Sequence, residues 1–155
     1  MNNSLISGIY NFRLVDDELS TSGQPSEDQL AALAKDGFEV VINLALHDDP
    51  RYSLPDEAGT VKSLGMDYVH IPVRFDAPAE SDLKEFFAAM KQHEGKKMLV
   101  HCAANMRVSV FVGLYRVIEL DWPKDDAFAL MDSLWEPNAV WKVFISNMLE
   151  KHLEK

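Results

Sequence analysis

One cysteine and one nearby arginine are the residues of this chain best suited to chemistry. Cys102 is the only cysteine, and Arg107 follows it after four intervening residues. A thiolate is a strong nucleophile, and a guanidinium can bind an oxyanion through two parallel hydrogen bonds. The pair therefore predicts a loop that binds a small anion and presents a nucleophilic sulfur to it.

The segments on either side of the pair indicate where this loop lies. An apolar segment predicted as a strand, Lys97 to His101, precedes Cys102, and an apolar segment predicted as a helix, Val108 to Leu120, follows Arg107. Ligands of open α/β sheets bind at the carboxyl ends of strands. The first N–H groups of a helix lack partners inside the helix and attract anions. We therefore expect an anion site at this strand end, where the helix dipole also favours the thiolate.

The residues between the cysteine and the arginine suit a tight anion-binding loop. Ala103 and Ala104 are small, so the backbone can approach a bound anion closely, and Asn105 tolerates a left-handed backbone conformation. The expected anion-binding residues are Ala103, Ala104, Asn105, Met106 and Arg107. The alternative is an unreactive buried cysteine beside an unrelated surface arginine. The shared position between a strand and an apolar helix favours the reactive pair.

The rest of the chain alternates between predicted strands and predicted helices. The predicted strands are Ile9 to Arg13, Glu18 to Ser22, Phe38 to Leu44, Asp67 to Ile71 and Lys97 to His101. The predicted helices are Ser26 to Lys35 (opened by a capping box with Gln29), Pro55 to Gly65, Ser81 to His93, Val108 to Leu120, Lys124 to Leu134 and Asn138 to Leu153. This alternation predicts an α/β domain with a mainly parallel central sheet flanked by helices.

Length and charge limit the classes of function. A chain of 155 residues suits one domain, expected over residues 1–155. The net charge of -10 disfavours a nucleic-acid surface and an anionic membrane surface. A small anionic ligand remains compatible, because a local pocket can be positive on an acidic protein.

Further composition features concern location and cofactors. No stretch approaches 18 apolar residues and the start lacks a signal-peptide pattern, so we expect a bacterial-type cytoplasmic protein. A single cysteine excludes an intrachain disulfide and a CxxC site. The histidines show no metal-ligand spacing, and we expect neither a metal nor another cofactor. The oligomeric state stays open.

The cysteine loop resembles the active-site loop of dual-specificity protein phosphatases, relatives of the protein tyrosine phosphatases, which reads His-Cys-x-x-Gly-x-x-Arg-Ser/Thr. The loop is more similar to that of bacterial beta-lactamase-hydrolase-like, phosphatase-like domains, which reads about His-Cys-Ala-Ser-Gly-Asn-Arg. The resemblance extends to three other segments: Ser22 to Pro25, Gly37 to Leu44 and Tyr68 to Val73.

The resemblance implies a cysteine-phosphatase-like fold and hydrolysis of a small anionic or phosphorylated substrate, a phosphate monoester. Cys102 would be the nucleophile that forms a cysteinyl-phosphate, and Arg107 would bind the phosphate and its transition-state charge. His101 would steady the loop by hydrogen bonding to its backbone. Asp76 would be the general acid for the leaving group.

Three departures from the phosphatase pattern leave alternatives open. Four residues, not five, separate Cys102 from Arg107, and Asn105 stands at the glycine position. Val108 replaces the Ser/Thr after the arginine, with Ser109 one place later as a supporting residue. Rhodanese-type sulfurtransferases also use four intervening residues, to hold a cysteine persulfide. The chain could therefore be a sulfurtransferase, or a phosphate-binding module without turnover.

Acidic residues outside the loop are weaker candidates for the site. Asp76 precedes Ala77 and Pro78, so a role as a simple turn residue is about as well supported as a catalytic one. Asp48 and Asp49 follow a predicted strand and could face the site, although a solvated loop is favoured.

Overall fold

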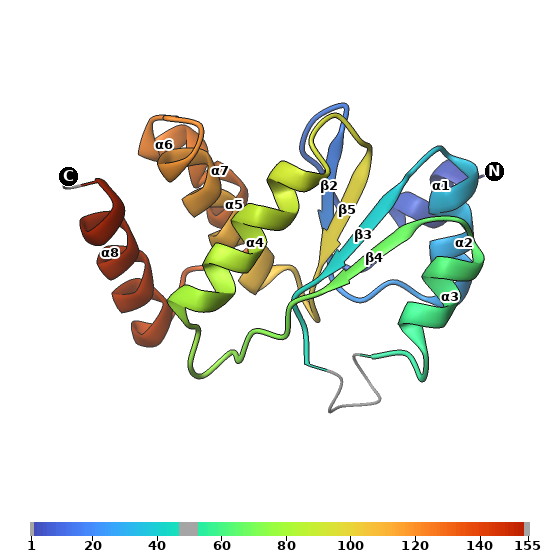
Figure 1. Cartoon of the computed structure of the whole chain (residues 1–155), viewed down its shortest axis with the longest axis horizontal. Coiled ribbons are helices and arrows are strands. Elements are labelled where there is room, and N and C mark those ends of the chain that lie inside the picture. Colours follow the sequence, from blue (N-terminus) through green and yellow to red (C-terminus); the bar gives the residue numbers. More distant parts are fainter. Residues whose placement is uncertain (1, 47–52, 154–155) are drawn as a thin grey trace.

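A five-stranded sheet with the order β1-β2-β5-β3-β4 lies at the centre of the computed structural model (Figure 1). The strands are β1 (Arg13–Leu14), β2 (Leu19–Ser22), β3 (Val40–Asn43), β4 (Asp67–His70) and β5 (Met98–His101). All neighbouring strands are parallel except β1, which pairs with β2 in the antiparallel sense. The predicted mainly parallel sheet is therefore confirmed. The structure describes residues 2–46 and 53–153, so Asp48 and Asp49 lie outside the described residues.

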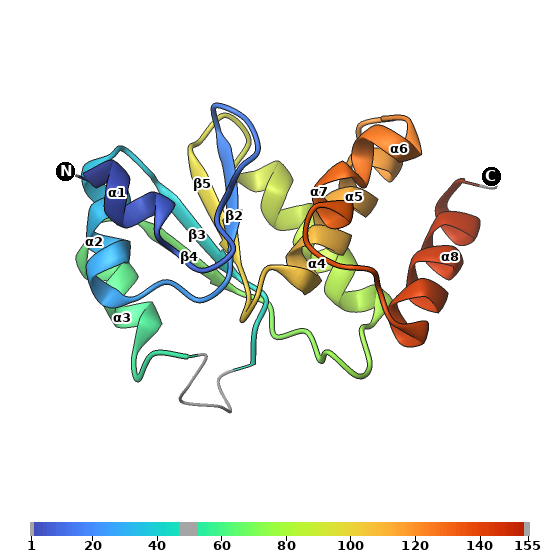
Figure 2. The same cartoon turned by 180° about the vertical axis from the view of Figure 1, so that it is seen from behind.

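Helices cover both faces of the sheet. They are α1 (Asn2–Ser7), α2 (Glu27–Lys35), α3 (Glu57–Ser63), α4 (Glu80–Gln92), α5 (Met106–Ile118), α6 (Lys124–Ala127), α7 (Ala129–Asp132) and α8 (Ala139–Leu153). Figures 1 and 2 show α1, α2 and α3 on one face, and α4 to α8 on the other. No helix within residues 2–46 and 53–153 is long and apolar enough to cross a membrane.

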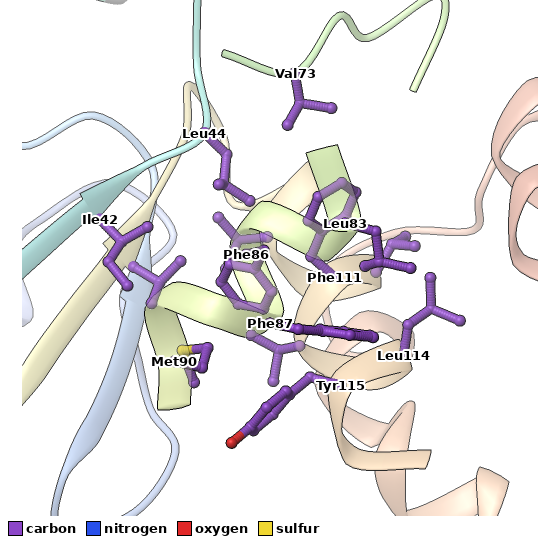
Figure 3. Packing of buried hydrophobic residues seen from close by; sticks show 14 of the residues in the cluster. Ile42, Leu44, Val73, Leu83, Phe86, Phe87, Met90, Phe111, Leu114 and Tyr115 are labelled. Atoms are coloured by element: carbon purple, nitrogen blue, oxygen red, sulfur yellow. The ribbon is translucent and has the colours of Figure 1, made fainter. Parts of the chain in front are cut away.

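The two faces are packed because alternate residues of a strand point to opposite sides of a sheet. In β3, Val40 and Ile42 belong to the larger core cluster, with α4 and α5, whereas Val41 belongs to the cluster under α2 and α3. Figure 3 shows Ile42 with Phe86 of α4 and Phe111 of α5 in the larger cluster. Burial on both faces explains why these strands are continuous apolar runs.

Strand β5 occupies the middle of the sheet, with β2 and β3 parallel to it on either side. Its last residue is His101, so Cys102 emerges at the carboxyl end of the central strand. The following helix, α5, is buried at every residue from 107 to 117. The predicted buried helix after the cysteine loop is therefore confirmed, and it begins two residues earlier than expected.

The N-terminal segment differs from the prediction. The strand expected over Ile9 to Arg13 is wrong for most of its length, because only Arg13–Leu14 pairs with β2. Asn11 has φ 51°, a left-handed conformation that an extended strand cannot contain. The preceding residues Asn2–Ser7 form a helix that the sequence pattern did not indicate.

Helix starts were predicted with mixed success. The capping box is confirmed: Ser26 Oγ accepts from the Gln29 N–H at 3.1 Å, and the Gln29 side chain accepts from the Ser26 N–H at 2.8 Å. The predicted cap at Ser81 is wrong, because α4 begins at Glu80. The residue before the helix is Ala79, which has no side-chain acceptor, and its own N–H donates to Asp82 at 3.2 Å. The single helix expected over Lys124 to Leu134 is the two short helices α6 and α7.

Candidate active site

Cys102 lies directly after β5 and is 1% exposed. Its N–H donates to the Ser22 carbonyl at 3.3 Å, and the Gln24 N–H donates to the Ala103 carbonyl at 3.0 Å. A β-carbon on Gly23 would lie 2.5 Å from the Ala103 carbonyl oxygen, closer than real contacts allow. The turn after β2 therefore packs directly against the cysteine loop, and glycine is required for that approach.

Asn105 fixes the shape of the loop. It has φ 68° and ψ 6°, the left-handed conformation expected for this position. Its Nδ2 donates to the Asn11 carbonyl at 2.8 Å and to Thr21 Oγ1 at 2.9 Å. In return, Asn11 Nδ2 donates to the Ala104 carbonyl at 3.0 Å. The Asn105 side chain thus ties the loop to the N-terminal segment and does not cap α5.

Because the Asn105 side chain does not cap α5, backbone N–H groups around the start of this helix are left without acceptors among the described residues. No described residue accepts a hydrogen bond from the backbone N–H of Ala103, Ala104 or Met106. The first turn of α5 also contains no acidic residue. A helix N-terminus with open N–H groups and no nearby carboxylate attracts an anion.

Arg107 adds a full positive charge to the same place. The residue is 9% exposed, and its Nη1 donates to the Val73 carbonyl at 2.9 Å. Its Cζ lies 5.9 Å from the centre of the Phe75 ring. Within residues 2–46 and 53–153, no carboxylate lies at ion-pair distance from its guanidinium. A guanidinium has five N–H donors, so most of them remain for an anion.

Asp76 lies in the loop after β4, which Arg107 contacts through the Val73 carbonyl, but its carboxylate pairs with Arg74. Its side chain is 72% exposed and receives hydrogen bonds from Arg74 Nε at 3.1 Å and Nη2 at 2.9 Å. These bonds hold the pKa of the Asp76 carboxyl below its ordinary value. No hydrogen bond or ion pair joins Asp76 to Arg107 or Cys102. The structure brings the backbone of this loop to the site, with the carboxylate turned to Arg74.

His101 connects the cysteine loop to a carboxylate that the sequence did not single out. Its Nδ1 lies 3.3 Å from the Cys102 carbonyl oxygen, and its Nε2 lies 2.5 Å from Glu57 Oε2. The other oxygen of Glu57 accepts from Gln24 Nε2 at 2.7 Å. Glu57 is the first residue of α3, where acidic residues are common for reasons of the helix dipole alone. No sequence signal therefore distinguished it.

Ser109, Trp135 and Trp141 form hydrogen bonds that stabilise the start of α5 and the loop after β4. Ser109 Oγ donates to the Met106 carbonyl at 2.6 Å and accepts from Trp135 Nε1 at 3.0 Å. Trp141 Nε1 donates to the Phe75 carbonyl at 2.8 Å, and the Phe75 ring packs against both indoles. These contacts hold Phe75, in the loop between β4 and α4, beside Arg107. The described part of the chain contains no group of three or more His, Cys, Asp or Glu side chains placed to hold a metal ion.

Sequence comparison relates most of the chain to one protein family. Residues 13–132 match the family model described as "DSP-PTPase phosphatase fused to NAD+ Kinase". A beta-lactamase hydrolase-like protein from Xylella fastidiosa (strain Temecula1) is 30% identical over 118 residues. The match covers 75% of this chain and 27% of that relative, so the chain spans little more than a quarter of the relative's length.

Comparison with solved structures gives the same relation. A candidate phosphatase of the DUF442 family from Shewanella putrefaciens CN-32 is 35% identical and superposes with a TM-score of 0.85, covering 96% of this chain and 97% of that one. Tk-PTP in its active form shares the fold at 23% identity, with a TM-score of 0.73 over 94% of this chain and 97% of that one.

Proposed function

The chain belongs to the family described as DSP-PTPase phosphatase fused to NAD+ kinase, and we propose that it hydrolyses phosphate monoesters through Cys102 and Arg107. One observation carries the proposal. Arg107 is nearly buried, and its guanidinium has no described carboxylate at ion-pair distance. The residue belongs to the first turn of a helix whose first N–H groups also have no described acceptor. Cys102 directly precedes this loop at the end of the central strand.

In the proposed reaction, the Cys102 thiolate attacks the phosphorus atom of the ester. The sulfur–phosphorus bond forms as the bond from phosphorus to the ester oxygen breaks, and Asp76 gives its proton to that leaving oxygen. The Arg107 guanidinium and the backbone N–H groups from Ala103 to Arg107 bind the non-bridging oxygens and their added charge. Water then attacks the phosphorus and gives a proton to the Asp76 carboxylate, while the sulfur–phosphorus bond breaks, which releases inorganic phosphate and regenerates the thiolate. Asp76 must leave Arg74 to reach the leaving group.

Two alternatives each have one supporting observation. The four-residue interval between Cys102 and Arg107 favours sulfur transfer, in which the thiolate takes the outer sulfur of thiosulfate as a persulfide and releases sulfite. Val108, in place of a hydroxyl residue after Arg107, favours a phosphate-binding module without turnover. Ser109 does not replace that hydroxyl in this structure, because its Oγ is bonded to Met106 and Trp135.

Mass spectrometry of the intact protein separates these functions. After rapid acid quenching from a nitrophenyl phosphate reaction, a phosphoryl group on Cys102 is the expected result. A gain of one sulfur after exposure to thiosulfate, without phosphorylation, would make the protein a sulfurtransferase. Sulfate or phosphate binding with neither adduct would leave only the binding module. The Cys102→Ser variant is the control that must show neither phosphoenzyme turnover nor persulfide.

A further inference from the structure

Three side chains from distant segments, Gln24, Glu57 and His101, form a hydrogen-bond network that ends at the backbone carbonyl of Cys102. Gln24 donates to Glu57, Glu57 meets Nε2 of His101, and Nδ1 of His101 faces the carbonyl of Cys102. Glu57 and His101 are both fully buried, at 0% exposure. The proposed hydrolysis uses neither residue directly, and nothing in the family match assigns Glu57 a role.

Each ring nitrogen of His101 faces an oxygen. The carbonyl oxygen of Cys102 can only accept a hydrogen bond, so Nδ1 must carry a proton. Across the 2.5 Å contact, one proton is shared between Nε2 and the Glu57 carboxyl. Two arrangements fit: an imidazolium beside a carboxylate, or a neutral imidazole beside a carboxylic acid.

Full burial by itself favours the neutral forms of both groups, but two features of Glu57 stabilise the carboxylate. Its second oxygen accepts a hydrogen bond from Gln24 at 2.7 Å, which stabilises the ionised form. It also occupies the first turn of α3, where the helix dipole favours negative charge. The neighbouring titratable group on β4 is Tyr68, whose pKa is raised by burial and by the charge of Glu57, so it remains a neutral phenol.

We propose that Glu57 keeps His101 as an imidazolium, protonated on both ring nitrogens, and that this buried cation favours the thiolate of Cys102. This inference rests on the proposed role of Cys102 as the nucleophile. The imidazolium donates to the backbone carbonyl of Cys102, the same residue that carries the sulfur. Glu57 is then a positioning residue: it acts on Cys102 only through His101.

The state of His101 can be read directly in the native protein. Long-range ¹⁵N–¹H spectra at neutral pH, assigned through the backbone of residues 100–102, should show both ring nitrogens of His101 protonated. An unprotonated Nε2 would overturn the proposal, because it would place the proton on Glu57. This measurement needs no variant, so it decides the proposal even if Glu57 variants do not fold.

The Glu57→Gln variant tests the effect on the cysteine. A glutamine amide can donate to an unprotonated Nε2 and accept from Gln24, so both contacts are kept while the charge is lost. We expect His101 to become neutral and the pH midpoint for alkylation of Cys102 by iodoacetamide to move upward, so that at a pH below the native midpoint alkylation slows about tenfold. A neutral His101 with an unchanged pH profile of alkylation would show that the cation does not act on Cys102.

Asp56→Asn is the matched control. Asp56 caps the same helix by accepting from the Gly59 N–H at 3.0 Å, and no hydrogen bond or ion pair joins it to His101. This change also removes one negative charge at the start of α3, so alkylation should remain near the native rate. Equal slowing in both variants would assign the effect to the helix end and contradict the proposal. Neither readout uses a phosphate ester, so a failure of the proposed hydrolysis is recognised separately.

Discussion

Arg107 donates a hydrogen bond from Nη1 to the backbone carbonyl of Val73 at 2.9 Å. This bond joins the cysteine loop to the loop after β4 that carries Arg74, Phe75 and Asp76. Because Arg107 is nearly buried, the bond also holds its guanidinium beside Val73 and the Phe75 ring. In the proposed reaction, the position of Asp76 relative to the phosphate would therefore depend on Arg107 as well as on Arg74.

Arg107→Lys should reduce kcat/KM for nitrophenyl phosphate by about 10²–10³, the range measured when one donor to a developing oxyanion is removed. Lysine keeps the charge but not the planar pair of donors. Steady-state kinetics provide the measurement. Arg13→Lys is the matched control, since Arg13 bonds to Ser133 and to its neighbour Phe12. A comparable loss in both variants would mean that the effect is not specific to the anion site.

Asp76→Asn should slow the hydrolysis of alkyl phosphates about a hundredfold, and that of nitrophenyl phosphate far less. An alkoxide needs a proton as the ester bond breaks, whereas nitrophenolate is a stable leaving group. The ratio of the two kcat/KM values is the quantity to compare between native protein and variant. Equal slowing of both esters would remove the general-acid role and leave Asp76 as a turn residue.

Arg74→Gln should move the alkaline limb of the pH–rate profile to higher pH for an alkyl phosphate. A general acid must be protonated, so activity falls as the pH rises through the pKa of Asp76. Arg74 holds that pKa low by hydrogen bonding, and its removal raises the pKa. The measurement is kcat/KM against pH. Any shift that persists when Asp76 is also replaced by Asn must come from another group.

Asn105→Ala should lower the free energy of unfolding more than Asn105→Gly, by about 1 kcal/mol, because only alanine adds the cost of a left-handed backbone. Both variants lose the two hydrogen bonds from Nδ2, at about 0.5–1.5 kcal/mol each. Urea unfolding of the three proteins measures the difference. Equal stability of the two variants would contradict the positive φ of this residue.

The sequence was sufficient for the four parallel strands, the central helix and the order of Cys102 and Arg107 along the chain. Strands β3 and β5 are short apolar runs, and α5 is apolar on all sides, so burial on every face was readable locally. The Ser26 and Gln29 capping box was also local, since its bonds join residues three positions apart. Strand β5, the cysteine loop and α5 follow one another directly along the chain. Because Cys102 and Arg107 are therefore close in sequence, their closeness in space could be predicted without knowing the fold.

Contacts between distant segments could not be predicted in this way. Glu57 meets His101 across 44 residues, and Asn105 meets Asn11 across 94. Their residue types fit ordinary helix starts and turns equally well, so their roles depend on which segments the sheet brings together. Asp76 is the converse case: its place in the loop after β4 followed from the sequence, but its partner did not. That partner, Arg74, lies only two positions away, and both side chains are exposed, so the pair forms within the loop itself.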